Sequence, residues 1–539
     1  MSASSHTSLG ELLLSAARRN PDHDAIVFPD ERFTYAQFAE RSETIARALL
    51  ARGIKPGDHL GILAANRPEY LPFMFACFMI NAVAVLLNAR FRTQELRHLV
   101  RHCDLKWVIA GNLEAVPHAE RLLEAFPEMQ AAAIGNAIAG EAAPMLERAI
   151  TLDPCASGHF DTWQGFLASA SLTSQETLKQ AQNAVKPSDT ALIMFTSGTT
   201  SMPKGCALSH ESVFLTSAAM RDRLSITHTE VMWDPLPMFH MAAILPLFSV
   251  MHEAGTFLTD SSIDMDRAIE QIHREQPTFL YPAFPAIMDD LLQHPRLNPS
   301  QLGGIRLINN VAHAEVLRAN MAAIPSAIHI SAYGMTELSG IACHTDPADS
   351  DEERATTCGQ PYTNVELTIR DPDSGGPCEQ GQQGEICVRG FSVFQGYYKQ
   401  PEENAKAFDS DGWFHTGDLG SLDEKGRVRF HGRLKDMLKV GGENVSPLEI
   451  EAWLSTHPDI AMVQVVAAPD PRLQEVVAAF IELRPGAQME EQNIFDYCSG
   501  QIASFKVPRV VRFVTQWPMS ATKIQKAVLR QMLVDESTP

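Results

Sequence analysis

The sequence predicts an α/β protein with more than one domain, because strand-like and helix-like segments alternate along 539 residues. Short apolar runs such as 59–63 and 191–195 are typical of buried strands. Apolar residues at helical spacing lie between such runs, which indicates sheets with helices on both faces. A chain of this length is too long for one hydrophobic core, so we expect at least two domains.

The first hundred residues show this alternation in order. Apolar residues at helical spacing predict helices over 10–19 and 35–52, and the second is stopped by Gly53. The elements expected around and after them are strands at 25–28, 33–35 and 59–63, a helix from Pro68, a strand ending at Leu87 and Asn88, and a helix from Thr93.

Two further segments need interpretation. The uncharged segment 71–88 barely reaches the length of a membrane-spanning helix. Pro72, Asn81 and the apolar run 82–87 favour a buried helix followed by a buried strand. Residues 112–186 are rich in Ala, Gly, Pro and Ser, and we expect a peripheral region of helices and loops there.

The last hundred residues predict a smaller α/β unit, from about residue 437 to the end. Its expected elements are helices at 447–455 and 489–499 and strands at 460–468 and 475–483.

Composition narrows the classes of partner. The chain carries 44 basic and 65 acidic residues, a formal charge of −21, which disfavours nucleic acid or an anionic membrane as a main partner. Nine cysteines without a C-x-x-C pair are typical of free thiols in a reducing compartment. The first seven residues lack the basic and apolar regions of a signal peptide, so we expect a cytoplasmic protein.

The most informative stretch is 196–205, Thr-Ser-Gly-Thr-Thr-Ser-Met-Pro-Lys-Gly, directly after the strand expected at 191–195. Five hydroxyl side chains, two glycines and a lysine fall within these ten residues. Hydroxyl and backbone N–H groups donate to phosphate oxygens, glycine allows close approach, and lysine adds positive charge. The common phosphate loop G-x-x-x-x-G-K-[ST] does not fit, and a solvated turn is the alternative.

The stretch resembles the phosphate-binding loop of the adenylate-forming superfamily, which comprises acyl-CoA synthetases, adenylation domains of peptide synthetases, and luciferases. Nine of the ten positions fit the pattern T-S-G-T-T-G-x-P-K-G, with Ser201 in place of a glycine. The resemblance extends from about Leu9 to Arg530 through four more motifs in the same order. It implies nucleotide binding by Thr196, Ser197, Gly198, Thr199, Thr200 and Lys204.

The resemblance also implies an architecture. It predicts a large N-terminal domain, 1–435, of layered β-sheets flanked by helices, which binds the nucleotide and the acyl group. A small mobile C-terminal α+β domain, 436–539, would act as a lid and carry a catalytic lysine.

Residues 333–337, Tyr-Gly-Met-Thr-Glu, match the superfamily's Y-G-x-T-E motif after a strand expected at 329–332. The match implies that Tyr333 stacks on adenine beside Gly334. Thr336 would contact the α-phosphate or the acyl carboxylate, and Glu337 would bind Mg²⁺, a cation that prefers oxygen ligands.

Two later segments complete the nucleotide and CoA motifs. Residues 413–420 match W-x-x-T-G-D, which implies that Asp418 holds the ribose, since a carboxylate can accept from two vicinal hydroxyls. Residues 432–447 resemble R-x-K-D-x-I-K-x-x-G, which implies that Arg433 also holds the ribose and that Asp436 is the hinge. The same match implies that Lys439, Gly441 and Gly442 bind CoA.

The acyl end is marked by two runs. His240 ends Pro-Leu-Pro-Met-Phe-His, which looks like the family motif beside the acyl pocket and makes His240 a candidate catalytic residue; a His at the edge of the core is the alternative. A histidine here argues against α-amino acids, whose ammonium group pairs with an aspartate in the amino-acid-activating members. Asn309 and Asn310 stand where the family usually has glycines, either inside the acyl pocket or in a turn without ligand contact.

The segment 518–526 resembles the family's catalytic-lysine segment P-x-T-x-x-G-K. The match places the catalytic lysine at Lys523, with Thr522 in place of the usual glycine. Lys526, three residues later, is a competitor for this role.

Together these matches predict an AMP-forming acyl-CoA ligase that uses ATP, Mg²⁺ and CoA and acts on a carboxylic acid. Two alternatives remain: an adenylating enzyme that loads a carrier protein, and a nucleotide-binding protein without turnover. The acid stays open between fatty, aromatic, steroid side-chain and carnitine-like acids. Dimers are common in the family.

Overall fold

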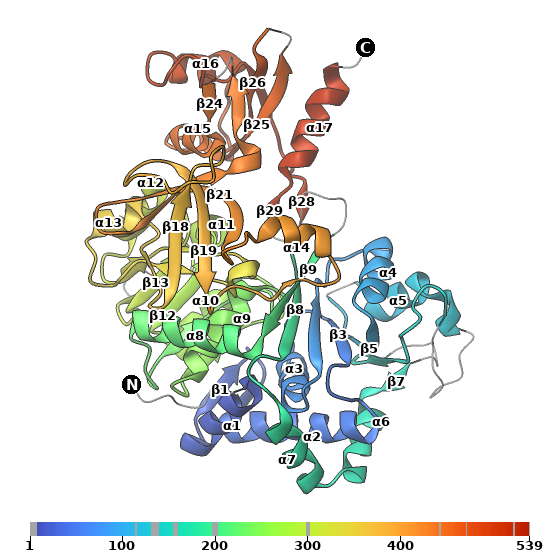
Figure 1. The fold of residues 1–539 in the computed structure, drawn as a ribbon. Helices are drawn as coiled ribbons and strands as arrows, with labels where there is room; N and C mark the ends of the chain where they lie inside the picture. Colours follow the sequence, from blue (N-terminus) through green and yellow to red (C-terminus); the bar gives the residue numbers. More distant parts are fainter. Residues whose placement is uncertain are drawn as a thin grey trace.

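The computed structural model describes residues 8–113, 116–130, 140–154, 160–196, 203–297, 302–440, 443–470, 472–520 and 523–537. Figure 1 shows a large N-terminal part, in blue through yellow, with a smaller C-terminal part, in orange and red, above it. The expected α/β class with a large N-terminal and a small C-terminal domain is confirmed.

The first large sheet runs in the order β20-β9-β8-β4-β3-β5-β6-β7. Neighbours from β8 through β7 pair in parallel, and β9 pairs with β8 in the antiparallel direction. Its strands are β3 (His59–Leu63), β4 (Val83–Leu87), β5 (Leu105–Ala110), β6 (Arg148–Thr151), β7 (Asp161–Thr162), β8 (Thr190–Thr196), β9 (Lys204–Ser209) and β20 (Gly396–Tyr397).

The second large sheet runs in the order β14-β13-β12-β10-β11-β1-β2 and is parallel except for β2. Its strands are β1 (Asp24–Val27), β2 (Arg32–Thr34), β10 (Val231–Trp233), β11 (Thr256–Leu258), β12 (Phe279–Ala283), β13 (Leu307–Asn310) and β14 (Ile328–Ile330).

Two smaller sheets follow in the chain. One holds β15 (Ala332–Tyr333), β16 (Cys343–His344) and β17 (Gln360–Pro361), and the other holds β18 (Val365–Arg370), β19 (Gly384–Gly390), β21 (Phe414–Leu422) and β22 (Val428–Arg433). Both are antiparallel, so their motifs lie on hairpin-like pairs rather than on crossovers.

Helices cover and separate the sheets. Those of the N-terminal part are α1 (Leu9–Arg19), α2 (Tyr35–Ala51), α3 (Tyr70–Met79), α4 (Thr93–His102), α5 (His118–Ala125), α6 (Trp163–Ala168), α7 (Gln175–Ala184), α8 (His210–Leu224), α9 (Met241–Met251), α10 (Met265–Glu275), α11 (Pro285–Gln293), α12 (Ala314–Ala323), α13 (Asp351–Thr356) and α14 (Pro401–Ala407). Short 3₁₀ turns are η1 (Pro127–Gln130), η2 (Ser169–Leu172), η4 (Thr336–Leu338) and η5 (Leu434–Asp436).

The apolar segment 71–88 forms the helix and strand that the sequence predicts. Every residue of α3 is buried, and so is every residue of β4, which explains the absence of charge. No helix among the described residues is long and apolar enough to cross a membrane.

The region 112–186 differs from its expectation. It contains the helices α5, α6 and α7, but it also supplies β6 and β7, which extend the first sheet beyond β5. These strands are four and two residues long, too short to give a periodic signal in a region rich in small residues.

The C-terminal part is built on one sheet, in the order β24-β23-β26-β25 with β27 beside β26. Its elements are β23 (Leu438–Val440), β24 (Glu443–Val445), α15 (Pro447–Leu454), β25 (Ile460–Asp470), β26 (Gln474–Leu483), α16 (Glu491–Cys498), β27 (Val510–Phe513), β28 (Met519–Ser520), β29 (Lys523–Ile524) and α17 (Lys526–Ser537). The two faces of this sheet pack into two separate apolar clusters, one with α15 and α16 and the other with α17. The boundary that the sequence predicts between residues 435 and 436 falls inside η5 and stays a prediction.

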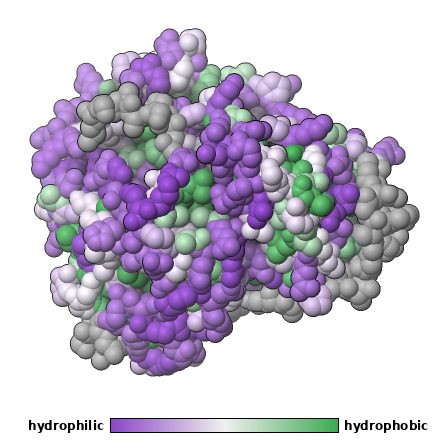
Figure 2. All heavy atoms as spheres, turned by 90° about the horizontal axis from the view of Figure 1, so that it is seen from below, coloured by the Kyte–Doolittle hydropathy of each residue, from purple (hydrophilic) through white to green (hydrophobic). Residues whose placement is uncertain are grey.

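Apolar side chains of the N-terminal part gather in one large and one smaller internal cluster around the two sheets. Polar residues cover most of the face in Figure 2, with small apolar patches between them. The buried apolar clusters therefore hold the two sheets in place, and the ends of the strands and the turns between them are available to form a binding site.

Candidate active site

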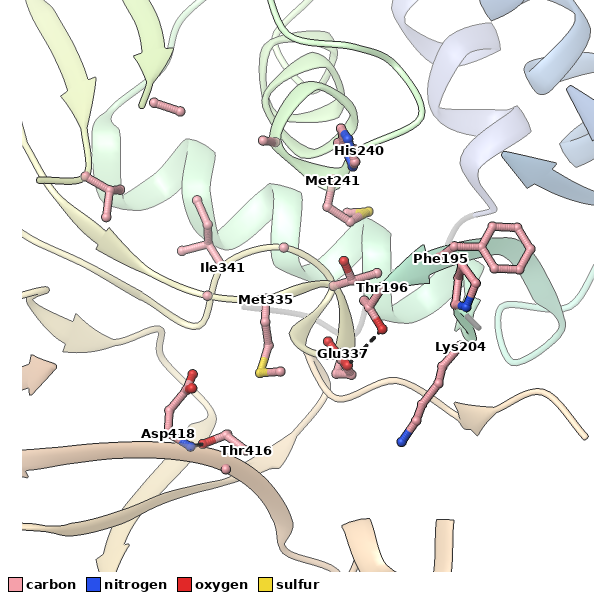
Figure 3. Close-up of a pocket in the computed structure, with 18 of the residues that line it drawn as sticks. Phe195, Thr196, Lys204, His240, Met241, Met335, Glu337, Ile341, Thr416 and Asp418 are labelled. Carbon is pink, nitrogen blue, oxygen red and sulfur yellow. Dashed lines mark hydrogen bonds between the residues drawn. The ribbon is translucent and has the colours of Figure 1, made fainter. Parts of the chain in front are cut away.

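A cavity of about 650 Å³ lies where the ends of β8, β12 and β13 meet the turn after β15 and the strands β21 and β22. Carboxyl ends of parallel strands are the usual place for ligands in α/β folds. Figure 3 shows His240 and Met241 on one side of the cavity, Asp418 and Thr416 on the opposite side, and Thr196 and Glu337 between them. The cavity thus brings together residues from five of the predicted motifs.

The predicted site residues that line the cavity come from both large sheets, from the segment before α9, from the turn after β15 and from β21 and β22. They are Thr196, Lys204, His240, Asn309, Gly334, Thr336, Glu337, Asp418 and Arg433. Asn310 is not among the lining residues, although it is completely buried.

Glu337 lies at the floor of the cavity, in the turn η4, and is only 4% exposed. Its Oε1 accepts hydrogen bonds from the hydroxyls of Tyr397 at 2.9 Å and Thr196 at 3.4 Å (Figure 3 marks the second). Burial, reinforced by the Glu337 carboxylate, raises the pKa of Tyr397, so this hydroxyl remains a donor.

The second oxygen of Glu337, Oε2, is buried and has no hydrogen-bond partner among the described residues. A buried carboxylate oxygen without a partner is costly unless a ligand satisfies it. Hard cations such as Mg²⁺ take oxygen ligands from one or two carboxylates together with phosphates. The donor set at Glu337 therefore fits the magnesium ion that the sequence predicts.

Lys204 stands at the start of β9, directly after the part of the loop that the structure leaves undescribed. Its amino group forms an ion pair with Glu403 of α14 and lies 4.9 Å from the centre of the Tyr397 ring. Lys204 and Lys406 lower the pKa of Glu403 to about 2 through hydrogen bonds and charge. The predicted phosphate ligands Ser197, Gly198, Thr199 and Thr200 lie outside the described residues.

Asp418 and Arg433 face each other across an antiparallel strand pair, in register on β21 and β22. Arg433 Nε lies 3.6 Å from Asp418 Oδ1, and Asp418 is only 6% exposed. The pairing explains why two motifs fifteen residues apart supply one candidate ribose site.

Tyr333 supports Asp418 in a way that the sequence did not suggest. Its hydroxyl donates to Asp418 Oδ2 at 2.9 Å, and its ring lies 5.9 Å from that of Phe430. Burial, with the neighbouring Asp418 carboxylate, raises the pKa of Tyr333 well above its usual value, so the hydroxyl stays protonated. The adenine contact expected of Tyr333 remains a prediction.

Glu385 is a second supporting residue that the sequence analysis missed. Its Oε1 accepts from the backbone N–H of Gly417 at 2.9 Å, and its Oε2 lies 2.8 Å from His415 Nδ1. With Cys387 these side chains form a group of potential metal ligands. Burial raises the pKa of the Cys387 thiol to about 12, so the group fits a hydrogen-bonded support for the turn before Asp418 better than a thiolate metal site.

Gly334 is required by close packing. A Cβ atom at this position would lie 1.9 Å from the carbonyl oxygen of Gly340 and 2.5 Å from Ile341 Cα. Only glycine therefore allows the chain after β15 to pack this closely against residues 340 and 341. This close packing positions Thr336 and Glu337 at the cavity.

His240 precedes α9 and its ring lies 4.8 Å from that of Phe239. The extended backbone of His240 turns the chain from the buried segment 236–239 into the helix. The structure thus places His240 on the cavity wall, as the sequence predicts, without assigning it a chemical role.

Of the residues predicted in the C-terminal part, Asp436 and Lys439 are described with their side chains, and neither lines this cavity. Asp436 lies in η5, where its Oδ1 accepts from Arg530 Nη2 at 2.8 Å. Lys439 lies exposed in β23, and Gly441 and Gly442 fall outside the described residues. Lys523 begins β29, but its side chain is not described.

The competitor Lys526 has a structural partner. Its amino group donates to the buried carboxylate of Glu451 at 2.6 Å. Lys435 also lines the cavity, although the sequence motifs assigned it no role. Partial burial lowers the pKa of its amino group, and the positive charge of Arg433 lowers that pKa further.

Comparison with known proteins agrees with these motifs. The AMP-binding enzyme family matches residues 13–398, and the AMP-binding enzyme C-terminal domain matches residues 449–523. The chain is 33% identical over 538 residues to YngI of Bacillus subtilis, provisionally named an acyl-CoA synthetase, with 98% of each chain covered. It is 31% identical over 538 residues to the mitochondrial medium-chain acyl-CoA ligase ACSF2 of Rattus norvegicus, covering 97% of this chain and 87% of the relative.

A solved structure extends the comparison to three dimensions. ATP-bound MatB from Rhodopseudomonas palustris superposes with a TM-score of 0.84 at 26% identity, covering 98% of this chain and 99% of that one. The similarity therefore includes both the large and the small part of the molecule.

Proposed function

The chain belongs to the AMP-binding enzyme family of adenylate-forming acyl-CoA synthetases and ligases, and within it we propose that the protein is an ATP-dependent acyl-CoA ligase that releases AMP. One observation carries the proposal. The buried Glu337, with one oxygen lacking a partner among the described residues, and the pair of Asp418 and Arg433 line the same cavity.

We assign the first half-reaction to this cavity. A carboxylate is a poor acyl donor because its leaving group would be oxide, and adenylation replaces that group with AMP. The substrate oxygen attacks the α-phosphate of ATP in line, and pyrophosphate leaves. This chemistry needs orientation and charge neutralisation more than covalent help from the protein.

The residues would divide this work as their positions suggest. Asp418 and Arg433 hold the ribose, with Tyr333 and Gly334 at the adenine, and Lys204 and the loop residues Thr196, Ser197, Gly198, Thr199 and Thr200 hold phosphates. Glu337 would hold Mg²⁺, which neutralises phosphate charge when it is bound. Lys523, Thr336 and His240 are the proposed catalytic residues around the reacting carboxylate and α-phosphate.

The second half-reaction would use a different arrangement of the small C-terminal part. We propose that this part rotates about Asp436, so that Lys523 leaves the cavity and Lys439, Gly441 and Gly442 form the path for CoA. The CoA thiol, as thiolate, attacks the acyl carbonyl, and AMP leaves with the electron pair of the broken bond. Domain rotation is a common way to assemble alternative sites.

Location and assembly are part of the same proposal. The cysteines of the described residues are free thiols, which supports a reducing compartment such as the cytoplasm, although the ACSF2 relatives are named as mitochondrial. Size-exclusion chromatography with light scattering would test whether the enzyme is a homodimer.

The decisive experiment measures AMP and pyrophosphate release with ATP, Mg²⁺ and a panel of carboxylic acids, with and without CoA. We expect CoA-dependent AMP release that Lys523→Ala largely abolishes. Lys526→Ala is the matched control, because its loss breaks the Glu451 ion pair and should affect stability more than turnover. Pyrophosphate release that ignores CoA would instead support a carrier-protein acceptor, and no release with any acid would overturn the proposal.

A further inference from the structure

A line of polar side chains is buried beside the acyl end of the cavity, on neighbouring parallel strands. Trp233 pairs with Leu280 and Leu280 with Ile308. The residues that follow these three are Asp234, just past the end of β10, Tyr281 on β12 and Asn309 on β13, and the register between β12 and β13 shifts before Ala283 pairs with Asn310. Tyr281 and Asn309 both line the cavity.

Asn309 is fixed in one orientation by two buried neighbours. His344 Nε2 lies 3.2 Å from Asn309 Oδ1, and His344 Nδ1 lies 2.6 Å from the Tyr362 hydroxyl. Burial lowers the pKa of His344 to about 3, so its ring is neutral and carries one N–H. Since an amide oxygen can only accept, His344 donates from Nε2 and accepts from Tyr362 at Nδ1.

This chain of hydrogen bonds involves only the oxygen of the Asn309 amide and leaves its NH₂ group without a partner among the described residues. Asn309 is completely buried, and its Nδ2 group has no hydrogen-bond partner among the described residues. A buried N–H group without a partner is costly, so the site is completed when a ligand offers an acceptor.

The side chain that contacts Asn309 is neutral: it is the His344 ring, which in turn bonds to the Tyr362 hydroxyl. Burial raises the pKa values of Tyr281, Tyr362 and Asp234 above their usual range, so the two tyrosine hydroxyls stay protonated and the charged form of Asp234 is disfavoured. The Arg223 guanidinium near His344 donates to the backbone carbonyls of His344, Gln360 and Pro361. A charged group placed beside Asn309 would lose its hydration without gaining a free counter-charge from these side chains.

We propose that Asn309 is a specificity-determining residue whose amide N–H donates to an uncharged acceptor, such as a keto oxygen, on the chain of the carboxylic acid substrate. The inference rests on the proposed ligase function and names its substrate class. The apolar lining residues Met241, Ala242, Phe284, Val311 and Ile341 would hold the hydrocarbon part of the same acid. A plain saturated acid would leave the amide unsatisfied, and a second carboxylate would be buried without a partner.

The test compares straight-chain acids of equal length, one unsubstituted and the others with a single keto oxygen at successive carbons. We expect kcat/KM for the best keto acid to exceed that of the unsubstituted acid about tenfold or more, the usual effect of leaving a buried donor unpaired. Asn309→Leu should bring the ratio of these two kcat/KM values close to one.

Two further variants separate specificity from folding. Asn310→Leu changes the adjacent buried amide, which does not line the cavity, and should preserve the ratio. Tyr362→Phe removes only the hydroxyl that holds the His344 ring, and should reduce the ratio while the protein stays folded. It also replaces Asn309→Leu as the test if that variant does not fold.

Equal kcat/KM for all acids in the wild type would overturn the inference and leave the ligase function standing. If no acid supports AMP release, the ligase function fails, and equilibrium binding of the same acids in the presence of AMP decides the inference. Tighter binding of a keto acid that Asn309→Leu abolishes would support it, and equal binding of all acids would overturn it.

Discussion

Individual side chains in the cavity act through hydrogen bonds that their motifs do not reveal. Sequence patterns predicted that Asp418 and Glu337 face a ligand, and both line the cavity. The patterns did not predict that Tyr333 donates to Asp418 or that Tyr397 donates to Glu337. Such contacts join residues 85 and 60 positions apart, which single-sequence reasoning cannot pair.

Tyr333→Phe should raise KM for ATP about tenfold with a smaller effect on kcat, because a hydrogen bond to a buried carboxylate is lost while the ring is kept. Pyrophosphate release at varied ATP concentration measures the change. Tyr398→Phe is the control, since it removes a similar bond to Asp104, a carboxylate that, unlike Asp418, does not line the cavity. An unchanged KM in Tyr333→Phe would contradict the supporting role.

Glu337→Gln should lower kcat/KM at least about a hundredfold and weaken the dependence on Mg²⁺, because the charge at Oε2 is removed. The amide oxygen can still accept from Tyr397, so the melting temperature should change little. Titration of activity with Mg²⁺ checks this. A variant with wild-type magnesium dependence would place the metal elsewhere.

At the scale of elements, regular periodic segments were predicted well and short ones poorly. The strand expected at 59–63 is β3, and the helix expected at 35–52 is α2, which ends one residue earlier. The strands β6 and β7 were missed because two to four residues carry no period, and their place is set by pairing, of β6 with β5 and of β7 with β6. Secondary-structure propensity depends on the residues of one segment alone, whereas these two strands form because they pair with another strand of the sheet.

The turn between β15 and η4 gives an element-level prediction. Gly334→Ala should lower the melting temperature by several degrees and abolish activity, because its Cβ would overlap the Gly340 carbonyl. Gly304→Ala is the matched control, as its added methyl group meets no atom within 4 Å. Thermal unfolding of both variants measures the difference, and equal stability would show that the turn can shift.

At the scale of the whole molecule, the arrangement of the small C-terminal part is held partly by the bond from Arg530 to Asp436. Arg530→Ala should slow pyrophosphate release roughly two- to fivefold and leave thioester formation from a preformed acyl-adenylate unchanged, because an ion pair of this exposure contributes up to about 1 kcal/mol. Single-turnover assays of each half-reaction measure both rates. A selective loss of thioester formation would assign this arrangement to the second half-reaction.

Stability of the whole molecule should fall in mild acid. Burial lowers the pKa of His210 to about 4 and those of His252 and His344 to about 3, whereas an unfolded histidine titrates near about 6.5. Below pH 6.5 the unfolded chain binds protons that the folded protein does not, so this stability is fully present above about pH 6.5 and is lost as pH falls. We expect a loss of roughly 1.4 kcal/mol per pH unit for each histidine between about pH 6 and 4.

Urea unfolding at several pH values measures this loss. Replacement of His252 by a neutral residue of similar size should flatten the pH dependence, even if it lowers stability at neutral pH. A free energy of unfolding that stays constant from neutral pH to pH 5 would contradict the neutral state of these buried rings.

The pair of Lys204 and Glu403 gives the phosphate end of the cavity its own counter-ion. In the proposed function, a phosphate of the nucleotide would replace Glu403 as the partner of Lys204, so binding would exchange one anion for another instead of neutralising an exposed positive charge. Because Glu403 already neutralises Lys204, few dissolved anions would be released from this lysine when ATP binds. Part of the electrostatic attraction between Lys204 and the phosphate would be spent on separating Lys204 from Glu403. In a protein with a net charge of −21, this exchange favours ligands that bring several contacts at once over free inorganic phosphate, and it makes nucleotide affinity less sensitive to salt than a bare lysine would.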